Sequence, residues 1–133
     1  MNTTYTLTHA QRRVWFTELL DPGTSICNLA ACVKFRGAID LDVLRRALDF
    51  SVSRHDSLHF QLTEGKGEEP DLYLAEHRPL SIETIDLTKA GKSERNKWID
   101  DQTSIPFKLF HSPLYQFTLL AISSEEVWLY AKF

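Results

Sequence analysis

The sequence has little of what a disulfide scaffold, a metal cluster or a membrane protein needs. It has two cysteines, Cys27 and Cys32, in 133 residues, too few for a disulfide framework. Their spacing matches no zinc-ligand pair, because no second pair exists to complete a set of four ligands. No apolar run approaches the roughly 18 residues of a membrane helix, and residues 1–9 lack the charged and apolar parts of a secretory signal. We therefore expect two reduced cysteines, no bound metal, no membrane contact and a cytoplasmic location.

A surplus of positive charge is also missing. Fifteen Lys and Arg stand against 18 Asp and Glu, which gives a net charge of −3. Proteins that bind nucleic acids usually concentrate positive charge against phosphates, so no nucleic-acid partner is expected. Of the whole sequence, 43% of the residues are hydrophobic and 25% are charged. These are the proportions of a single globular domain that can bury its own core.

The spacing of apolar residues predicts helices and strands in alternation. Thr8-His9-Ala10-Gln11 fits a capping box for a helix that ends near Leu20, before the helix-stopping segment Asp21-Pro22-Gly23. Asp40 is expected to cap a second helix that runs to about His55. A third, more polar helix is expected over about 88–103. Strands are predicted over 28–35, 58–63, 71–75, 81–87, 114–122 and 126–133.

This order of elements predicts the fold class. It indicates an α/β (α+β) sandwich, with a mixed sheet and helices on one face. Strands 58–63 and 71–75 are expected to pair through a turn at Gly65-Lys66-Gly67.

The last strand has a regular period of two that still continues at Phe133. Natural domains seldom end inside a strand, so we expect the chain to be the front part of something longer. An exposed terminal strand is also a place where chains pair, and we expect a possible homodimer through it. The apolar residues of the pattern are Val127, Leu129, Ala131 and Phe133, and they alternate with Trp128, Tyr130 and Lys132.

No catalytic set is complete from the residues alone. His55-Asp56-Ser57-Leu58-His59 imitates the H-E-x-x-H zinc motif, but that motif needs both histidines on one helical face, and the helix is expected to end at His55. Gly65-Lys66-Gly67 lacks the strand and helix that flank a phosphate loop. The cysteines have no histidine partner nearby in sequence, although folding could bring one close. We therefore expect no metal ligands, while a catalytic role for one of the cysteines stays an open alternative.

The order of several motifs resembles the condensation domain of nonribosomal peptide synthetases. The run from Thr8 to Phe16, T-H-A-Q-R-R-V-W-F, is similar to the opening motif of that family. Arg54-His55-Asp56-Ser57-Leu58 resembles the second motif, R-H-E-x-L. Pro106-Phe107-Lys108-Leu109, followed by Pro113-Leu114, resembles the P-F-x-L…P-L signature. The resemblance covers nearly the whole chain, with the motifs in the family's order.

The resemblance implies a chloramphenicol-acetyltransferase-like fold, in which two lobes surround a tunnel. Residues 1–133 would form the N-terminal subdomain, truncated just before the catalytic H-H-x-x-x-D-G motif, which would follow Phe133. No catalytic residue is then expected within the chain, and the missing C-terminal lobe becomes a partner. The motif residues are expected to be structural, with Arg12, Trp15, Arg54 and His55 as scaffold for the tunnel floor. The full motif set is Ala10, Gln11, Arg12, Trp15, Arg54, His55, Asp56, Pro106 and Phe107.

The resemblance also implies a reaction for the parent enzyme. It would form an amide bond between an acyl or peptidyl thioester donor and an aminoacyl acceptor, in the biosynthesis of a secondary metabolite such as an antibiotic or siderophore. Both substrates would sit on phosphopantetheine arms of carrier domains, with no cofactor bound directly. The chain by itself is expected to be inactive.

Two departures from the family pattern leave alternatives open. An arginine of the second motif is replaced by His59, and the usual arginine after Pro113-Leu114 is replaced by Gln116. The resemblance implies that the family's arginine braces the active-site aspartate by an ion pair. A histidine, mostly neutral at pH 7, would brace that aspartate less well. The alternatives are a non-catalytic module that docks a carrier or recruits a partner, an epimerisation or ester-forming relative, and an unrelated complete α/β domain.

Overall fold

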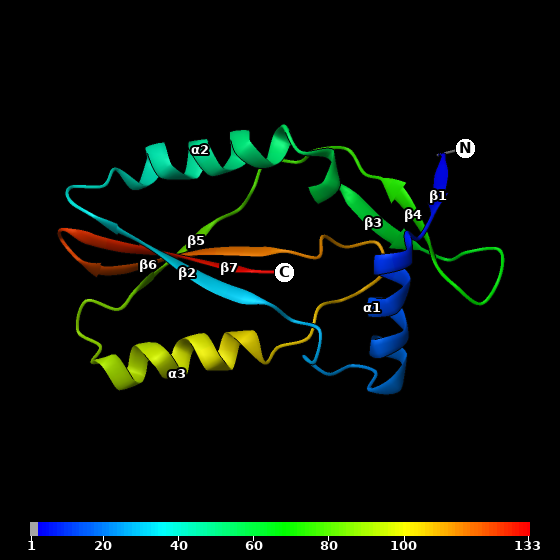
Figure 1. Cartoon of the computed structure of the whole chain (residues 1–133). Helices are drawn as coiled ribbons and strands as arrows, with labels where there is room; N and C mark the ends of the chain where they lie inside the picture. Colours follow the sequence, from blue (N-terminus) through cyan, green and yellow to red (C-terminus); the bar gives the residue numbers. More distant parts are fainter. Residues whose placement is uncertain (1–2) are drawn as a thin grey trace.

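The computed structural model describes residues 3–133 and contains two sheets, a four-stranded one and a three-stranded one (Figure 1). The strand orders are β2-β7-β6-β5 and β1-β4-β3. The helices and strands are β1 (Thr4–Thr6), α1 (His9–Leu20), β2 (Ala30–Arg36), α2 (Leu41–Ser53), β3 (Phe60–Thr63), β4 (Asp71–Leu74), β5 (Glu83–Asp86), α3 (Lys92–Thr103), β6 (Gln116–Ser123) and β7 (Glu126–Lys132).

The four-stranded sheet is mixed, as predicted, because β5 runs parallel to β6 while the other neighbours are antiparallel. The prediction that helices cover one face is wrong, since α2 lies on one face and α3 on the other (Figure 1). Leu119 and Leu129 pack toward Leu44 of α2. Leu120 and Tyr130 pack toward the α3 side, with Trp98. The alternating pattern of β7 therefore reflects two different apolar layers rather than one buried and one wet face.

The expectation of an exposed terminal strand is also wrong. β7 lies between β2 and β6, with paired backbone on both sides. Even Lys132, the last residue of the strand, is only 2% exposed. Periodicity reports which residues share a face, but it does not distinguish a central strand from an edge strand. The free edge that suggested a homodimer through this strand does not exist.

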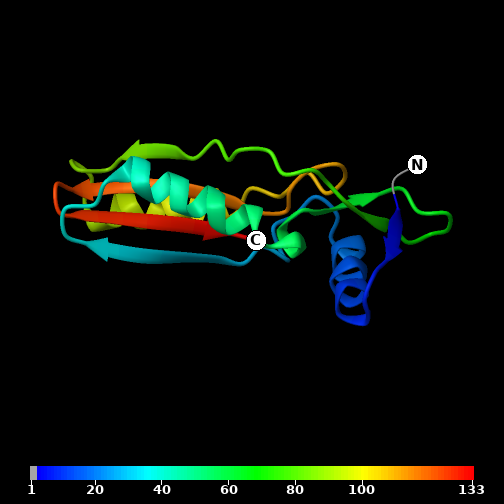
Figure 2. The same cartoon turned by 90° about the horizontal axis from the view of Figure 1, so that it is seen from above.

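The three-stranded sheet and α1 form a smaller unit at one end of the larger sheet (Figure 2). The β3–β4 hairpin is confirmed, with Leu62 opposite Leu72. β1 was not predicted; it pairs with β4 and places Tyr5 opposite Leu72. Leu7, Leu62 and Leu72 form the core of this unit, against which Trp15 packs.

The predicted helix starts are confirmed for the first two helices. Thr8 and Gln11 make both bonds of a capping box, and the Asp40 carboxylate accepts from the amides of Asp42 and Val43. The third helix begins at Lys92, four residues later than predicted, because Asp86 accepts from the amide and hydroxyl of Thr88 and so holds a turn there. No helix within residues 3–133 has the length and apolar character to cross a membrane.

Candidate functional site

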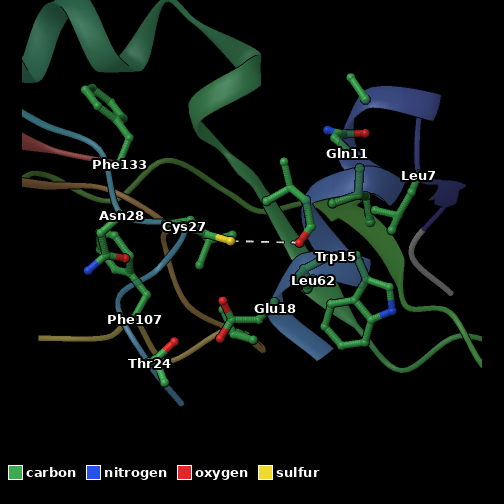
Figure 3. Close-up of a pocket in the computed structure, with 15 residues that line it drawn as sticks. Leu7, Gln11, Trp15, Glu18, Thr24, Cys27, Asn28, Leu62, Phe107 and Phe133 are labelled. Carbon is green, nitrogen blue, oxygen red and sulfur yellow. Dashed lines mark hydrogen bonds between the residues drawn. The ribbon is translucent and has the colours of Figure 1, made fainter. Parts of the chain in front are cut away.

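A cavity of about 360 Å³ lies where the smaller unit meets the end of the larger sheet (Figure 3). α1 forms one wall, and the segment between α1 and β2 faces it. Four of the predicted motif residues, Ala10, Gln11, Trp15 and Phe107, line this one cavity. The other lining residues are Leu7, Val14, Glu18, Thr24, Cys27, Asn28, Leu62, Leu72, Leu109, Leu114 and Phe133. The opening motif and the P-F-x-L signature, about 90 residues apart in sequence, thus meet in space.

The cavity wall contains one acid and one thiol, neither of which is set up for nucleophilic attack. Glu18 is only 9% exposed. Burial raises the pKa of the Cys27 thiol, and the nearby Glu18 carboxylate raises it further. The thiol faces the carbonyl oxygen of Val14 at 3.9 Å (Figure 3). A thiol with a raised pKa is a poor nucleophile, so the possibility of a catalytic Cys27 loses support. Cys32 is also free, and burial raises its pKa too.

Arg12 and Trp15 hold α1 to the smaller unit. The Arg12 Nε donates to Glu69 at 2.8 Å. Trp15 packs edge-on against Phe110, with ring centroids 6.0 Å apart. The indole Nε1 of Trp15 is buried and has no hydrogen-bond partner among the residues that the structure describes. Both side chains hold α1 against the smaller unit, and the structural role expected for them stays a prediction.

The second motif lies apart from the cavity, at the end of α2. His55 Nδ1 is 2.6 Å from the Ser51 carbonyl, and His59 Nε2 is 2.9 Å from the Val52 carbonyl. α2 ends at Ser53, so these histidines do not share a helical face. Arg54 and Asp56 are exposed, and Pro106 is exposed beside Phe107. Within residues 3–133 no three potential ligands gather around a metal-sized space.

The structure reveals a polar cluster that sequence analysis missed, at the end of β7. The buried Lys132 Nζ donates to the carbonyls of Gln102 and Ile105, each at 3.0 Å. It also lies over the Phe107 ring, 4.6 Å from the centroid. The ammonium is thus surrounded by a carbonyl from the end of α3 and by the segment that follows α3 and contains the P-F-x-L signature, which we call the motif loop. We call this arrangement the lysine cage, made of Gln102, Ile105, Phe107 and Lys132.

Hydrogen bonds from neighbouring side chains surround the lysine cage. Asn28 Nδ2 donates to the carbonyls of Thr103 and Ile105, each at 2.8 Å. The Thr103 hydroxyl bonds the Tyr130 hydroxyl at 3.0 Å, and Gln116 Nε2 reaches Gln102 Oε1 at 3.4 Å. Gln116, one of the departures from the family pattern, therefore borders the cage. No local signal marks Lys132, because its burial depends on α3, which covers that face.

Burial lowers the pKa of Lys132 below its ordinary value of 10.5. Between the lowered pKa and 10.5, the unfolded chain binds more protons than the folded chain, so this group makes stability rise with pH. We expect the free energy of unfolding of the wild type to increase relative to Lys132→Met as pH rises through that window. Urea titrations of both proteins at pH 7 to 10.5 measure the difference. A difference that stays flat or falls with pH contradicts the assignment of a buried ammonium.

The fold is that of a chloramphenicol-acetyltransferase-like lobe, and comparison with known proteins identifies the family. A family model, "Condensation domain", matches residues 1–133, and the chain belongs to that family. It is the N-terminal part of a nonribosomal peptide synthetase condensation domain, as the motif order predicted.

The relatives are synthetase subunits much longer than this chain. The chain is 61% identical over 130 residues to one of the plipastatin synthase subunits of Bacillus subtilis (strain 168), covering 98% of the chain and 5% of that protein. It is 35% identical over 133 residues to surfactin synthase subunit 1 of the same organism, covering 97% and 4%.

The solved structures that the chain resembles are also condensation domains. The starter condensation domain of rhizomide synthetase RzmA superimposes with a TM-score of 0.89 at 23% identity, covering 98% of this chain and 30% of that one. The first condensation domain of the calcium-dependent antibiotic synthetase gives 0.87 at 23% identity, covering 98% and 32%. The chain thus spans about a third of the solved domains, and the predicted chloramphenicol-acetyltransferase-like fold with a mixed sheet is confirmed.

Proposed function

We propose that the parent of this chain forms an amide bond between a carrier-bound acyl or peptidyl thioester and a carrier-bound aminoacyl acceptor. The match of the condensation-domain model to residues 1–133 carries this proposal. Both substrates would arrive on phosphopantetheine arms of carrier domains, one at each mouth of the tunnel. Holding the two reactants together supplies much of the rate in a reaction of this kind.

In this proposal residues 1–133 are the first lobe, and the H-H-x-x-x-D-G motif follows Phe133. The geometry at the end of β7 supports that placement. Phe133 exchanges two backbone hydrogen bonds with Leu29, each 2.8 Å, and its ring packs against Phe117 at 5.9 Å between centroids. A strand held this firmly gives the next residues a defined starting point, as a catalytic motif requires.

The motif residues would serve as scaffold for the tunnel rather than as reactants. Their contacts support this role, since Arg12 is bonded to Glu69 and His55 to the Ser51 carbonyl. Without the rest of the domain, the chain would have neither the motif nor the opposite tunnel wall. The 133-residue chain alone should therefore transfer no acyl group.

The test is a condensation assay with the parent synthetase. Donor and acceptor carriers are loaded with an acyl and an aminoacyl thioester, and the product on the acceptor carrier is identified by mass spectrometry. We expect the amide product from the wild type and none from a variant that replaces the second histidine of the motif after Phe133. Loading of both carriers should be equal in the two proteins. Amide formation by that variant, by the 133-residue chain alone, or by a parent without the motif would overturn the proposal.

A second candidate is a non-catalytic module that docks a carrier domain. His59 favours it, because this residue stands where the family has arginine and its Nε2 faces the Val52 carbonyl at 2.9 Å. An imidazole in this position lacks the planar guanidinium with which an arginine makes a bidentate ion pair. The same assay separates the candidates, because a docking module binds loaded carriers without forming product.

A further inference from the structure

Lys132 is a buried cation, and no carboxylate of residues 3–133 makes a salt bridge with it. Its side chain is among the largest fully buried ones in the chain, and burial alone lowers its pKa, with no charged neighbour contributing. The ammonium donates to two backbone carbonyls and lies over the face of Phe107. Moving an ammonium out of water costs free energy, even after the surrounding protein has relaxed around it.

The carbonyls do not need this lysine. The Gln102 carbonyl also accepts from the Ile105 amide at 3.3 Å, and the Ile105 carbonyl also accepts from Asn28 at 2.8 Å. Removing the ammonium would therefore leave neither oxygen without a donor. An apolar side chain of similar volume would fill the site and avoid the cost of burying a charge. Stability of the fold thus gives no reason for a lysine at this position.

What the ammonium adds is a connection between three segments. The negative end of the α3 dipole and its last carbonyls hold the charge from one side, and the motif loop supplies Phe107 from the other. Lys132 brings the end of β7 to both. On the next residue, just after β7, the Phe133 ring packs on Phe117. The last residue of β7 and the residue that follows it are therefore held by different contacts.

We infer that Lys132 is a positioning residue: its cage sets where the segment after β7 begins, and so where the catalytic motif lies relative to the tunnel. This inference rests on the proposed function, which places the motif after Phe133. Lys132 does not touch the reacting atoms. It acts through the strand, in the same way that remote contacts hold reacting groups at a productive distance.

The test uses the parent synthetase with Lys132→Met, which keeps the length and volume of the side chain and removes the charge. Lys108→Met is the matched control, because Lys108 is exposed on the same loop as Phe107. Condensation kinetics with carrier-bound donor and hydrogen exchange of the β7 amides are measured on all three proteins. We expect Lys132→Met to lower kcat on the order of tenfold or more, with KM for the donor unchanged. The Lys108→Met protein should match the wild type.

Exchange and thermal unfolding separate positioning from a general loss of structure. Amides at 130–133 should exchange faster in Lys132→Met, while the melting temperature stays equal or rises because a buried charge is gone. Phe107→Leu removes the ring from the cage and keeps the ammonium, and it should lower kcat in the same direction by a smaller factor.

The outcomes distinguish this inference from the proposed function. A wild type that loads its carriers but forms no amide overturns the proposed function, and the positioning of the motif falls with it. Where the wild type is active, a kcat for Lys132→Met within twofold of the wild type overturns only the role of Lys132. Unchanged exchange at 130–133 overturns the cage as a positioning device in either case.

Discussion

Leu119→Ala is expected to lower the free energy of unfolding of the chain by about 3 kcal/mol. Leu119 is 0% exposed and lies in β6, in the layer between the sheet and α2. Its neighbours there include Val127 and Leu129 of β7. Truncation removes the transfer free energy of the lost methyl groups and leaves a cavity. Because β6 is paired on both sides, the surrounding backbone has little freedom to collapse into it.

Urea unfolding followed by tryptophan fluorescence measures this loss. Leu20→Ala is the matched control, since it removes the same atoms at a position that is 82% exposed at the end of α1. The control should change stability by less than about 0.5 kcal/mol. Equal effects from the two substitutions would contradict the two-layer core, in which α2 and α3 pack on opposite faces of the sheet.

The elements that sequence analysis located well are those with local signals. The first helix begins where Thr8 and Gln11 cap each other, and the second begins at Asp40. Each such contact joins residues only two or three positions apart, so the pattern is visible in the sequence. β1 was missed for the opposite reason, because three residues with no apolar period pair only with a distant strand.

The burial of both faces of the sheet could not be predicted. The period of two in β7 is real, but Trp128 and Tyr130 face a layer formed by α3. Which helix covers which face depends on chain crossings between segments far apart, and periodicity contains no information on them. The same long-range packing hides Lys132 beneath residues 102–107, and it is the reason why the lysine cage was found only in the structure.

The candidate site divides in the same way. Motif resemblance named Ala10, Gln11, Trp15 and Phe107 separately, and the structure brings them to one cavity. The motif resemblance could not show that Arg54 and His55 lie away from this cavity, at the end of α2. Sequence motifs therefore gave the correct family, while the grouping of the named residues in space came from the fold.

Gly65→Ala is expected to destabilise the chain by about 2 kcal/mol, in the range found for overpacked sites. A Cβ at residue 65 would overlap the backbone carbonyl oxygen of Glu69, so the turn between β3 and β4 would have to open. Gly67→Ala, two residues away, is the control, because a Cβ there meets no atom within 4 Å. Urea unfolding of both variants measures the difference, and an effect of Gly65→Ala no larger than that of the control would contradict the close approach.

Gly65→Ala is also expected to disturb the opening motif, through the ion pair between Glu69 and Arg12. Glu69, whose carbonyl would be displaced, is the residue whose carboxylate accepts from Arg12 at 2.8 Å. Both side chains are about one-third exposed, so this pair contributes on the order of 1 kcal/mol or less. Arg12→Gln should therefore cost less in the Gly65→Ala background than in the wild type, because the turn that presents Glu69 has already moved. Equal costs in the two backgrounds would show that the turn and α1 are independent. The predicted coupling instead makes the β3–β4 turn the support of α1, and through α1 of the cavity wall that Gln11 and Trp15 form.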